Sequence, residues 1–250
     1  MARRLLIAGN WKLHKTVEEA VALAGDIAAG LGRDDLDVLV IPGFLALEPV
    51  ALSLSASPVL VGGQNLYWED LGAFTGETSG PQLKAAGARY VLVGHSERRQ
   101  YFGETEATCR LRLAAALRAG LKPILCVGET QAQREGGQTE GVLESQLAGA
   151  LAGFSPEQGA GITLAYEPVW AVGTGLTASE SQANEAHAHI RAWLGARFDK
   201  DVANTTRILY GGSVKPANAA GLLNQPEVDG ALIGGASLSA ESFLGIIRAA

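Results

Sequence analysis

The stretch Tyr90-Val91-Leu92-Val93-Gly94 shows the pattern from which the fold can be predicted. Four apolar or aromatic residues in a row end at a glycine and are followed by polar residues, as expected for a short strand buried on both faces. Seven further runs of this kind occur along the chain. The eight runs cover residues 5–9, 38–41, 59–63, 90–94, 124–128, 162–166, 208–211 and 231–234.

The stretches between these runs have the apolar spacing of helices. They predict helices over residues 17–29, 45–52, 81–86, 105–119, 140–151, 179–198, 216–223 and 241–248. Hydroxyl residues suited to N-caps precede four of them, and a glycine suited to a C-cap follows another. These residues are Thr16, Ser79, Ser179, Ser239 and Gly120. The alternation predicts parallel strands joined by right-handed helical crossovers.

Eight strand–helix units fit either an open doubly wound sheet or a closed (β/α)8 barrel, both of the α/β class. The barrel is favoured because eight units in about 250 residues are typical of it. The absence of a GxGxxG motif after the first run also argues against the open sheet. No linker rich in Ser, Pro or Gly divides the chain. The sequence therefore predicts a single barrel domain over residues 1–250.

Charge and cysteine content exclude several classes of protein. The net charge is −6 without acidic or basic blocks, which argues against a nucleic-acid or anionic membrane surface. Cys109 and Cys126 are too few and too far apart for a disulfide framework or a zinc knuckle, so a cytoplasmic location is expected. The first apolar run ends at Asn10, too early for an export signal. The uncharged stretch 49–66 is interrupted by prolines and is a poor membrane span.

Polar side chains collect where the predicted strands end. They are Asn10 and Lys12, Gln64 and Asn65, His95 and Glu97, Glu129, Glu167, and Ser213. In (β/α)8 barrels these ends meet at one mouth, where chemistry is located. Taken alone, Lys12 is best explained as a surface amine, His95 as a structural histidine and Glu167 as a helix-capping acid. Their shared position at the ends of strands one, four and six favours a common site.

Residues two apart point to the same side of an extended chain and to different faces of a helix. An extended exit from the first strand would therefore direct Asn10 and Lys12 to one side and Trp11 to the other. His187 and His189 lie on a predicted helix, so their spacing is poor for binding one metal ion. The sequence predicts no metal site.

Two glycine pairs end the last two predicted strands. Gly211 and Gly212 precede Ser213, and Gly234 and Gly235 precede a short polar segment. Glycines allow backbone amides to approach an anion, and a helix start after strand eight would add its positive end. One such pair is a weak signal. Two pairs, at loops where barrels often bind phosphate, predict a phosphate site.

Five motifs together resemble the triosephosphate isomerase family. They are AGNWK (8–12), VGHSERR (93–99), AYEPVWAVGTG (165–175), YGGSV (210–214) and GGASL (234–238). They run from the first strand to the last, and the first three together are highly specific. The resemblance implies a TIM barrel that interconverts dihydroxyacetone phosphate and D-glyceraldehyde 3-phosphate through an enediolate. It places this activity in glycolysis and gluconeogenesis, with no cofactor.

The resemblance also implies a role for individual residues. Glu167 matches the base that moves a proton between adjacent carbons, a task for which one group must return what it took. His95 matches a neutral donor to the charge that grows on the oxygens, assisted by Asn10 and by the positive charge of Lys12. Ser96 and Glu97 match supporting residues, near the resting Glu167 and near Lys12 respectively. Phosphate binding is implied for Asn10, Lys12, Gly173, Ser213, Gly234 and Gly235.

The segment after Glu167 has the composition of a lid. Pro168 fixes one backbone angle, whereas Gly173 and Gly175 leave theirs free, and apolar residues lie between. The resemblance implies that this lid closes over the substrate and excludes water from the enediolate. Leu176 stands where the family commonly has lysine.

The predicted connection Gln64–Ser79 is long and carries Tyr67, Trp68 and Phe74, more aromatic surface than a free loop should expose. In the family this loop inserts into a second subunit, so the resemblance implies a homodimer. The alternative is a loop that folds back on its own barrel.

Two other functions fit the same fold. A Schiff-base aldolase would use Lys12 as its nucleophile, but this residue lies beyond the strand end, beside Asn10, without the apolar burial that activates an amine. A phosphate-binding barrel without catalytic activity would not need both Glu167 and His95.

Overall fold

Eight parallel strands close into one barrel in the computed structural model, which describes residues 3–172 and 176–250. The strands are β1 (Leu6–Asn10), β2 (Asp37–Ile41), β3 (Leu60–Gly63), β4 (Tyr90–Val93), β5 (Lys122–Val127), β6 (Thr163–Tyr166), β7 (Ile208–Tyr210) and β8 (Gly230–Ile233). Each pairs with the next, and the pairing of β8 with β1 completes the ring. The predicted (β/α)8 fold is confirmed, and every predicted strand run overlaps one of these strands.

The barrel wall separates two apolar cores. Leu6 and Ala8 of β1 point inward and pack in the same cluster as Tyr90. Ile7, which lies between them, packs outward with the residues of the surrounding helices. Both faces of the wall are therefore buried, which explains why the strands are apolar throughout.

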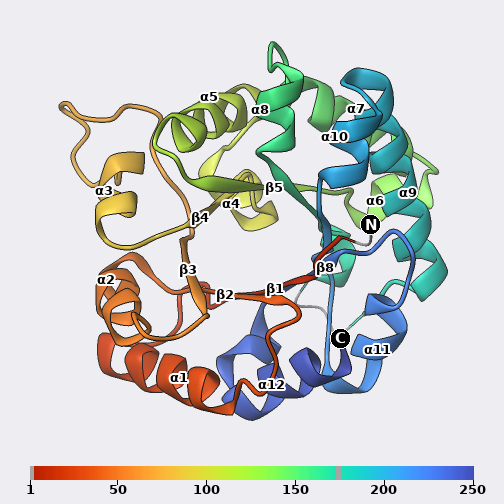
Figure 1. Ribbon diagram of the computed structural model, residues 1–250. Coiled ribbons are helices and arrows are strands. Elements are labelled where there is room, and N and C mark those ends of the chain that lie inside the picture. The colour runs from red at the N-terminus through yellow and green to blue at the C-terminus, as the bar shows by residue number, and fades with distance from the viewer. Residues whose placement is uncertain (1–2, 173–175) are drawn as a thin grey trace.

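Helices surround the barrel (Figure 1). They are α1 (Val17–Gly30), α2 (Phe44–Ser53), α3 (Gly80–Ala85), α4 (Ser96–Phe102), α5 (Glu106–Arg118), α6 (Gln131–Glu135), α7 (Thr139–Ala150), α8 (Pro156–Ala160), α9 (Glu180–Arg197), α10 (Lys200–Thr205), α11 (Pro216–Leu223) and α12 (Ala240–Ala249). Two 3-10 helices, η1 (Val169–Ala171) and η2 (Gly235–Leu238), accompany them. None of the described helices is both long and apolar enough to cross a membrane.

The helix prediction is correct for the long elements and incomplete for the short ones. All eight predicted helices form, and the side chains of Thr16, Ser79, Ser179 and Ser239 cap four of them. The apolar spacing does not predict α4, α6, α8 and α10, which have seven, five, five and six residues. Segments this short contain too few turns for a helical period to appear.

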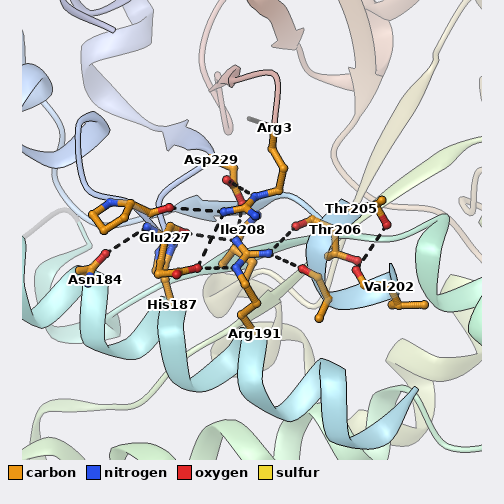
Figure 2. Close-up of polar contacts among 12 residues, drawn as sticks. Arg3, Asn184, His187, Arg191, Val202, Thr205, Thr206, Ile208, Glu227 and Asp229 are labelled. Carbon is orange, nitrogen blue, oxygen red and sulfur yellow. Dashed lines mark hydrogen bonds and ion pairs between the residues drawn. The ribbon is translucent and has the colours of Figure 1, made fainter. Parts of the chain in front are cut away.

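An ion-pair network joins elements at the amino-terminal end of the barrel (Figure 2). Arg191 of α9 contacts Glu227 at 2.5 Å and Asp229 at 2.6 Å. Asp229 also lies 2.6 Å from Arg3 Nε and accepts a hydrogen bond from the backbone N–H of Ile208. The network thus links α9, the start of β7, the segment before β8 and the chain that leads into β1.

His187 is completely buried beside this network. Its ring packs between Tyr166 and Tyr210, and its Nδ1 lies 3.1 Å from the carbonyl oxygen of Glu227. Burial disfavours the charged imidazolium and lowers the pKa of His187 to about 4 from its usual 6.5.

This burial makes the stability of the fold sensitive to acid. Because the unfolded chain binds a proton near pH 6.5 and the folded chain near pH 4, stability is full above pH 6.5 and falls as the pH drops toward 4. We expect His187 to account for a loss of about 2 kcal/mol in the free energy of unfolding between pH 7 and pH 5. Urea unfolding at the two pH values measures this loss.

The matched variants for this prediction are His187→Gln and His189→Gln on the same helix. His187→Gln should flatten the pH dependence between pH 7 and pH 5. His189 is partly exposed on the same helix, with its Nε2 3.2 Å from Glu144, and its replacement should leave most of the dependence in place. Equal pH slopes for wild type and His187→Gln would show that other groups cause the acid sensitivity.

Candidate active site

A cavity of about 490 Å³ opens at the carboxyl ends of the strands. The described residues that line it come from four strand exits and the connection after β6. They are Asn10, Lys12, His95, Glu167, Val172, Gly211, Gly212, Ser213, Val214, Lys215, Pro216, Leu232, Gly234, Gly235, Ala236 and Ser242. The structure thus brings together Asn10, Lys12, His95, Glu167, Ser213, Gly234 and Gly235, which the sequence analysis selected. Gly173 lies outside the described residues.

The exit of β1 is a turn and not an extended segment, so this detail of the prediction is wrong. Lys12 has a φ of 50°, in the left-handed region. Its N–H donates to the Asn10 side chain at 3.0 Å, and its carbonyl accepts from Gln64 Nε2 at 2.7 Å. Both Asn10 and Lys12 still face the cavity, whereas Trp11 is buried in the outer core.

The Lys12 side chain is held by an ion pair, and a neighbouring glycine leaves room for it. Its Nζ lies 2.6 Å from Glu97 Oε1. A Cβ atom at Gly234 would lie 3.2 Å from Lys12 Cε, so the glycine leaves room for the lysine side chain. Lys215 is a second cation on the cavity wall that the sequence analysis did not select. Lys12 is therefore not the only formal positive charge near a bound anion.

His95 is the N-cap of the unpredicted helix α4. The backbone N–H of Glu97 donates to His95 Nδ1 at 3.3 Å. A neutral imidazole that accepts at Nδ1 carries its proton on Nε2. Nε2 lies 3.0 Å from Glu167 Oε1, so the ring presents a donor to the cavity.

Glu167 follows β6 directly and is 2% exposed. Its Oε2 accepts a hydrogen bond from the backbone N–H of Ser96 at 2.8 Å, at the positive end of α4. A Cβ atom at Gly211 would lie 2.8 Å from Glu167 Cγ, so the glycine allows this packing. Burial, with the negative charge of Glu167 nearby, raises the pKa of the Cys126 thiol well above its usual value, and Cys126 is therefore inert.

Glu129 lies beneath the near end of the lid and does not line the cavity. It is fully buried, and its Oε1 accepts hydrogen bonds from Tyr166 Oη at 3.0 Å, Trp170 Nε1 at 3.0 Å and Arg134 at 3.1 Å. Burial and the adjacent Glu129 carboxylate raise the pKa of Tyr166. Glu129 therefore fixes the chain that follows β6 through Trp170 and does not line the cavity.

Ala178, which follows the segment predicted to be a lid, is held by a side chain of β7. The N–H of Ala178 donates to Tyr210 Oη at 3.2 Å, and burial raises the pKa of Tyr210 to about 12. A Cβ atom at Gly212 would lie 2.2 Å from the same hydroxyl oxygen. Gly212 is therefore required by the packing of the Tyr210 hydroxyl, in addition to any role in binding an anion.

The two glycine loops form part of the cavity wall. Ser213 follows Gly212, and its carbonyl accepts from the side chain of Asn218 at 3.2 Å. After β8 the chain enters η2 at Gly235, as the predicted short helix requires. A side chain at Gly235 would meet no atom within 4 Å, so its backbone is open to the cavity. Such a wall suits an anion bound by backbone amides.

The sequence model of the triosephosphate isomerase family matches residues 5–250. The triosephosphate isomerase of Chloroflexus aurantiacus is 54% identical over 244 residues, which cover 97% of this chain and 98% of that protein. The triosephosphate isomerase of Trichlorobacter lovleyi is 52% identical over 247 residues, which cover 98% of each. The crystal structure of triosephosphate isomerase from Bartonella henselae superposes with a TM-score of 0.89 at 42% identity, over 98% of each chain.

These matches span the barrel from end to end and include every strand exit that lines the cavity. The chain is an isomerase and belongs to the triosephosphate isomerase family.

Proposed function

We propose that Glu167 is the base of this isomerase, which interconverts dihydroxyacetone phosphate and D-glyceraldehyde 3-phosphate in glycolysis and gluconeogenesis. One observation carries the proposal: a buried carboxylate and the Nε2 of His95 lie 3.0 Å apart in the cavity. The carboxylate takes a proton from one carbon of the substrate and returns it to the next. In the resting site it accepts a hydrogen bond from the Ser96 N–H. It must give up this bond before it can contact the carbon-bound proton of the substrate.

The donors of the proposed site stabilise the enediolate. His95 presents its Nε2 proton to the substrate oxygens, and the Asn10 side chain assists from the β1 exit. Lys12 supplies fixed positive charge, and Glu97 positions it through the 2.6 Å ion pair. Donors that are already in place when charge develops lower the barrier to reaction.

The phosphate group is proposed to bind at the glycine loops, through the amides of Ser213, Gly234 and Gly235 and through Gly173 of the lid. The position of the first three on one wall supports this assignment. Closure of the lid excludes water while the enediolate exists.

A coupled isomerase assay tests the proposed activity directly. A Schiff-base aldolase would instead leave an adduct at Lys12 after borohydride reduction in the presence of substrate. The ion pair between Lys12 and Glu97 supports a role for the lysine as a charge and not as a nucleophile. A reducible adduct at Lys12 would contradict this role.

We also propose that the enzyme is a homodimer through the loop Gln64–Ser79. The loop extends away from the barrel before α3 (Figure 1), and residues 71–77 at its tip are exposed. Aromatic contacts order the loop: the Tyr67 ring stacks on Trp68 with centroids 4.1 Å apart and lies tilted against Phe74 with centroids 4.7 Å apart. The exposure of residues 71–77 supports a contact with a second subunit over a loop that folds back on its own barrel.

A groove suited to such a loop lies next to Lys12. It has a volume of about 530 Å³ and runs between residues 12–19 and 43–46. Leu13 and Leu45 on its rim are almost fully exposed. Since each subunit carries both a loop and a groove, a two-fold dimer would bury both twice.

Shortening the loop between Tyr67 and Gly76 to a brief polar turn should give a folded monomer with activity lower on the order of 10²-fold. Thr75 and Glu77 at the tip are proposed to support the Asn10, Lys12 and His95 region of the second subunit. A catalytic group that shifts by about 1 Å can lose on the order of 10² in rate. Sedimentation and circular dichroism report mass and folding. A folded monomer with full kcat would show that each subunit is catalytically self-sufficient.

Residues 1–250 are proposed to form a single domain in the cytoplasm. The closed barrel includes strands from both ends of the chain, which supports the assignment of a single domain. Cys109 and Cys126 are both free and buried, which supports a reducing compartment.

A further inference from the structure

We propose that Gln146 is a positioning residue for Glu167 and acts through the backbone of Gly128. Gln146 lies on α7, outside the barrel, and is not among the residues that line the cavity. Its side-chain amide makes two hydrogen bonds to one residue. Oε1 accepts from the Gly128 N–H at 2.8 Å, and Nε2 donates to the Gly128 carbonyl at 3.2 Å. The proposal rests on the assignment of Glu167 as the base.

Gly128 is in direct contact with the backbone of Glu167. A Cβ atom at Gly128 would lie 1.7 Å from the carbonyl oxygen of Glu167 and 2.5 Å from its carbonyl carbon. On either side of this contact, Glu167 N–H donates to Val127 at 2.8 Å and Val169 N–H donates to Glu129 at 3.0 Å. The exit of β5 is therefore the surface on which the backbone of Glu167 rests, and a shift of one moves the other.

The position of Gly128 explains why its backbone needs a side chain from another element as its hydrogen-bond partner. The carbonyls of Val127 and Glu129 face the chain that follows β6. In an extended chain the residue between them turns its N–H and carbonyl to the opposite edge. That edge belongs to β4, which has already ended, and its chain turns away at Gly94 with a φ of 70°. Unpaired backbone groups at this place would destabilise the exit. The Gln146 amide, with one donor and one acceptor, replaces the missing strand.

Arg99 plays a similar part at Cys126, two residues before Gly128 on the same edge. Its Nε donates to the carbonyl of Gly94 at 2.8 Å, and its Nη2 donates to the carbonyl of Cys126 at 3.2 Å. Glu106 accepts from the same guanidinium at 2.8 Å and holds it in place. Past the end of β4, the free edge of β5 is thus paired by side chains at both Cys126 and Gly128.

Gln146 itself is held by a rigid support. Leu143 and Leu147, on the same helix, are completely buried in the outer core. A helix fixed in this way transmits its position through the two amide bonds to Gly128, and from there to Glu167. The connection requires no contact between Gln146 and the substrate.

Gln146→Met tests the inference, because methionine keeps the length of the side chain and removes both hydrogen bonds. If the base shifts by a fraction of an ångström, kcat should fall by about 10-fold, since a shift of about 1 Å costs on the order of 10². KM should change by less than about twofold, because the phosphate wall lies on β7 and β8 and makes no contact with Gln146. A kcat within about twofold of wild type would overturn the proposal.

Asn184→Leu is the matched control. The Asn184 amide accepts a hydrogen bond from the backbone N–H of Glu227 at 3.1 Å (Figure 2), and Asn184 is not among the residues that line the cavity. Its loss should lower the melting temperature and leave kcat at 25 °C unchanged. If both variants lower the melting temperature and neither lowers kcat, the role of Gln146 is structural and the proposal is wrong.

A second measurement separates this inference from the assignment of the base. In a Glu167→Gln background, Gln146→Met should have little further effect on the residual rate, because the group it positions is gone. A full additional 10-fold loss would show that Gln146 acts elsewhere. If Glu167→Gln alone retained activity, the assignment of the base would fail, and this inference with it. If only Gln146→Met were silent, the base would stand and the inference alone would fail.

Discussion

Glu167→Gln should lower kcat by roughly 10²–10⁴-fold, the contribution of a positioned general base. Glutamine has the shape of glutamate and can remain beside Ser96 and His95, but it cannot accept a proton from carbon. The affinity for inorganic phosphate should stay close to that of the wild type, because the glycine loops are unchanged. The coupled assay measures kcat, and competitive inhibition by phosphate measures the affinity.

Glu167→Asp is the informative companion to this variant. It keeps the carboxylate and withdraws it by one methylene group, so its rate should lie between those of wild type and Glu167→Gln. Circular dichroism checks that both variants fold. Retention of more than about half of the wild-type kcat by Glu167→Gln would assign the proton transfer to another group.

Lys12→Met should lower kcat/KM on the order of 10²–10³-fold and should weaken substrate binding as well as turnover. Two unit charges about 4 Å apart near a protein surface interact by about 4 kcal/mol, which corresponds to roughly 10³-fold. The paired Glu97 carboxylate, left without its lysine, adds negative charge to a site that must accept an anion. Steady-state kinetics as a function of substrate concentration separates the effects on binding and turnover.

Lys215→Met is the control for charge in general. It removes the same formal charge from the cavity wall, but from an exposed residue that lacks the Glu97 partner. We expect a much smaller loss, and one that diminishes as salt is added, because solvent and ions screen exposed charges. Equal losses for Lys12→Met and Lys215→Met would mean that net charge, and not the placement of Lys12, governs the reaction.

The strands and long helices could be predicted because their signals are local and repeated. A buried strand such as Tyr90–Val93 is apolar along its whole length, and a helix such as α9 is long enough to show its period. Strand ends are also local features, so the grouping of Asn10, His95 and Glu167 followed once the barrel was assumed. Placing them in one cavity required no knowledge of individual contacts.

The remaining features depend on contacts between distant parts of the chain. The turn at Lys12 is held by Gln64, fifty-two residues later, and so does not appear in the local sequence. Helix α4 is short and mostly polar, yet its first turn provides the backbone N–H that fixes His95, its N-cap, and the N–H that donates to Glu167. The contact of Gln146 with Gly128 joins a helix to a strand end. Hydrophobic periodicity contains no information on such pairs.

The ion-pair network around Arg191 and Asp229 lies at the opposite end of a densely packed wall from the cavity. We expect changes there to alter the lifetime of the folded state and to leave the catalytic rate unchanged, because no residue of the network lines the cavity. The two traits can therefore be adjusted independently by natural selection or by an engineer. A lineage that moves to warmer surroundings could reinforce the region of Arg3 and Glu227 and keep every loop around Glu167 as it is.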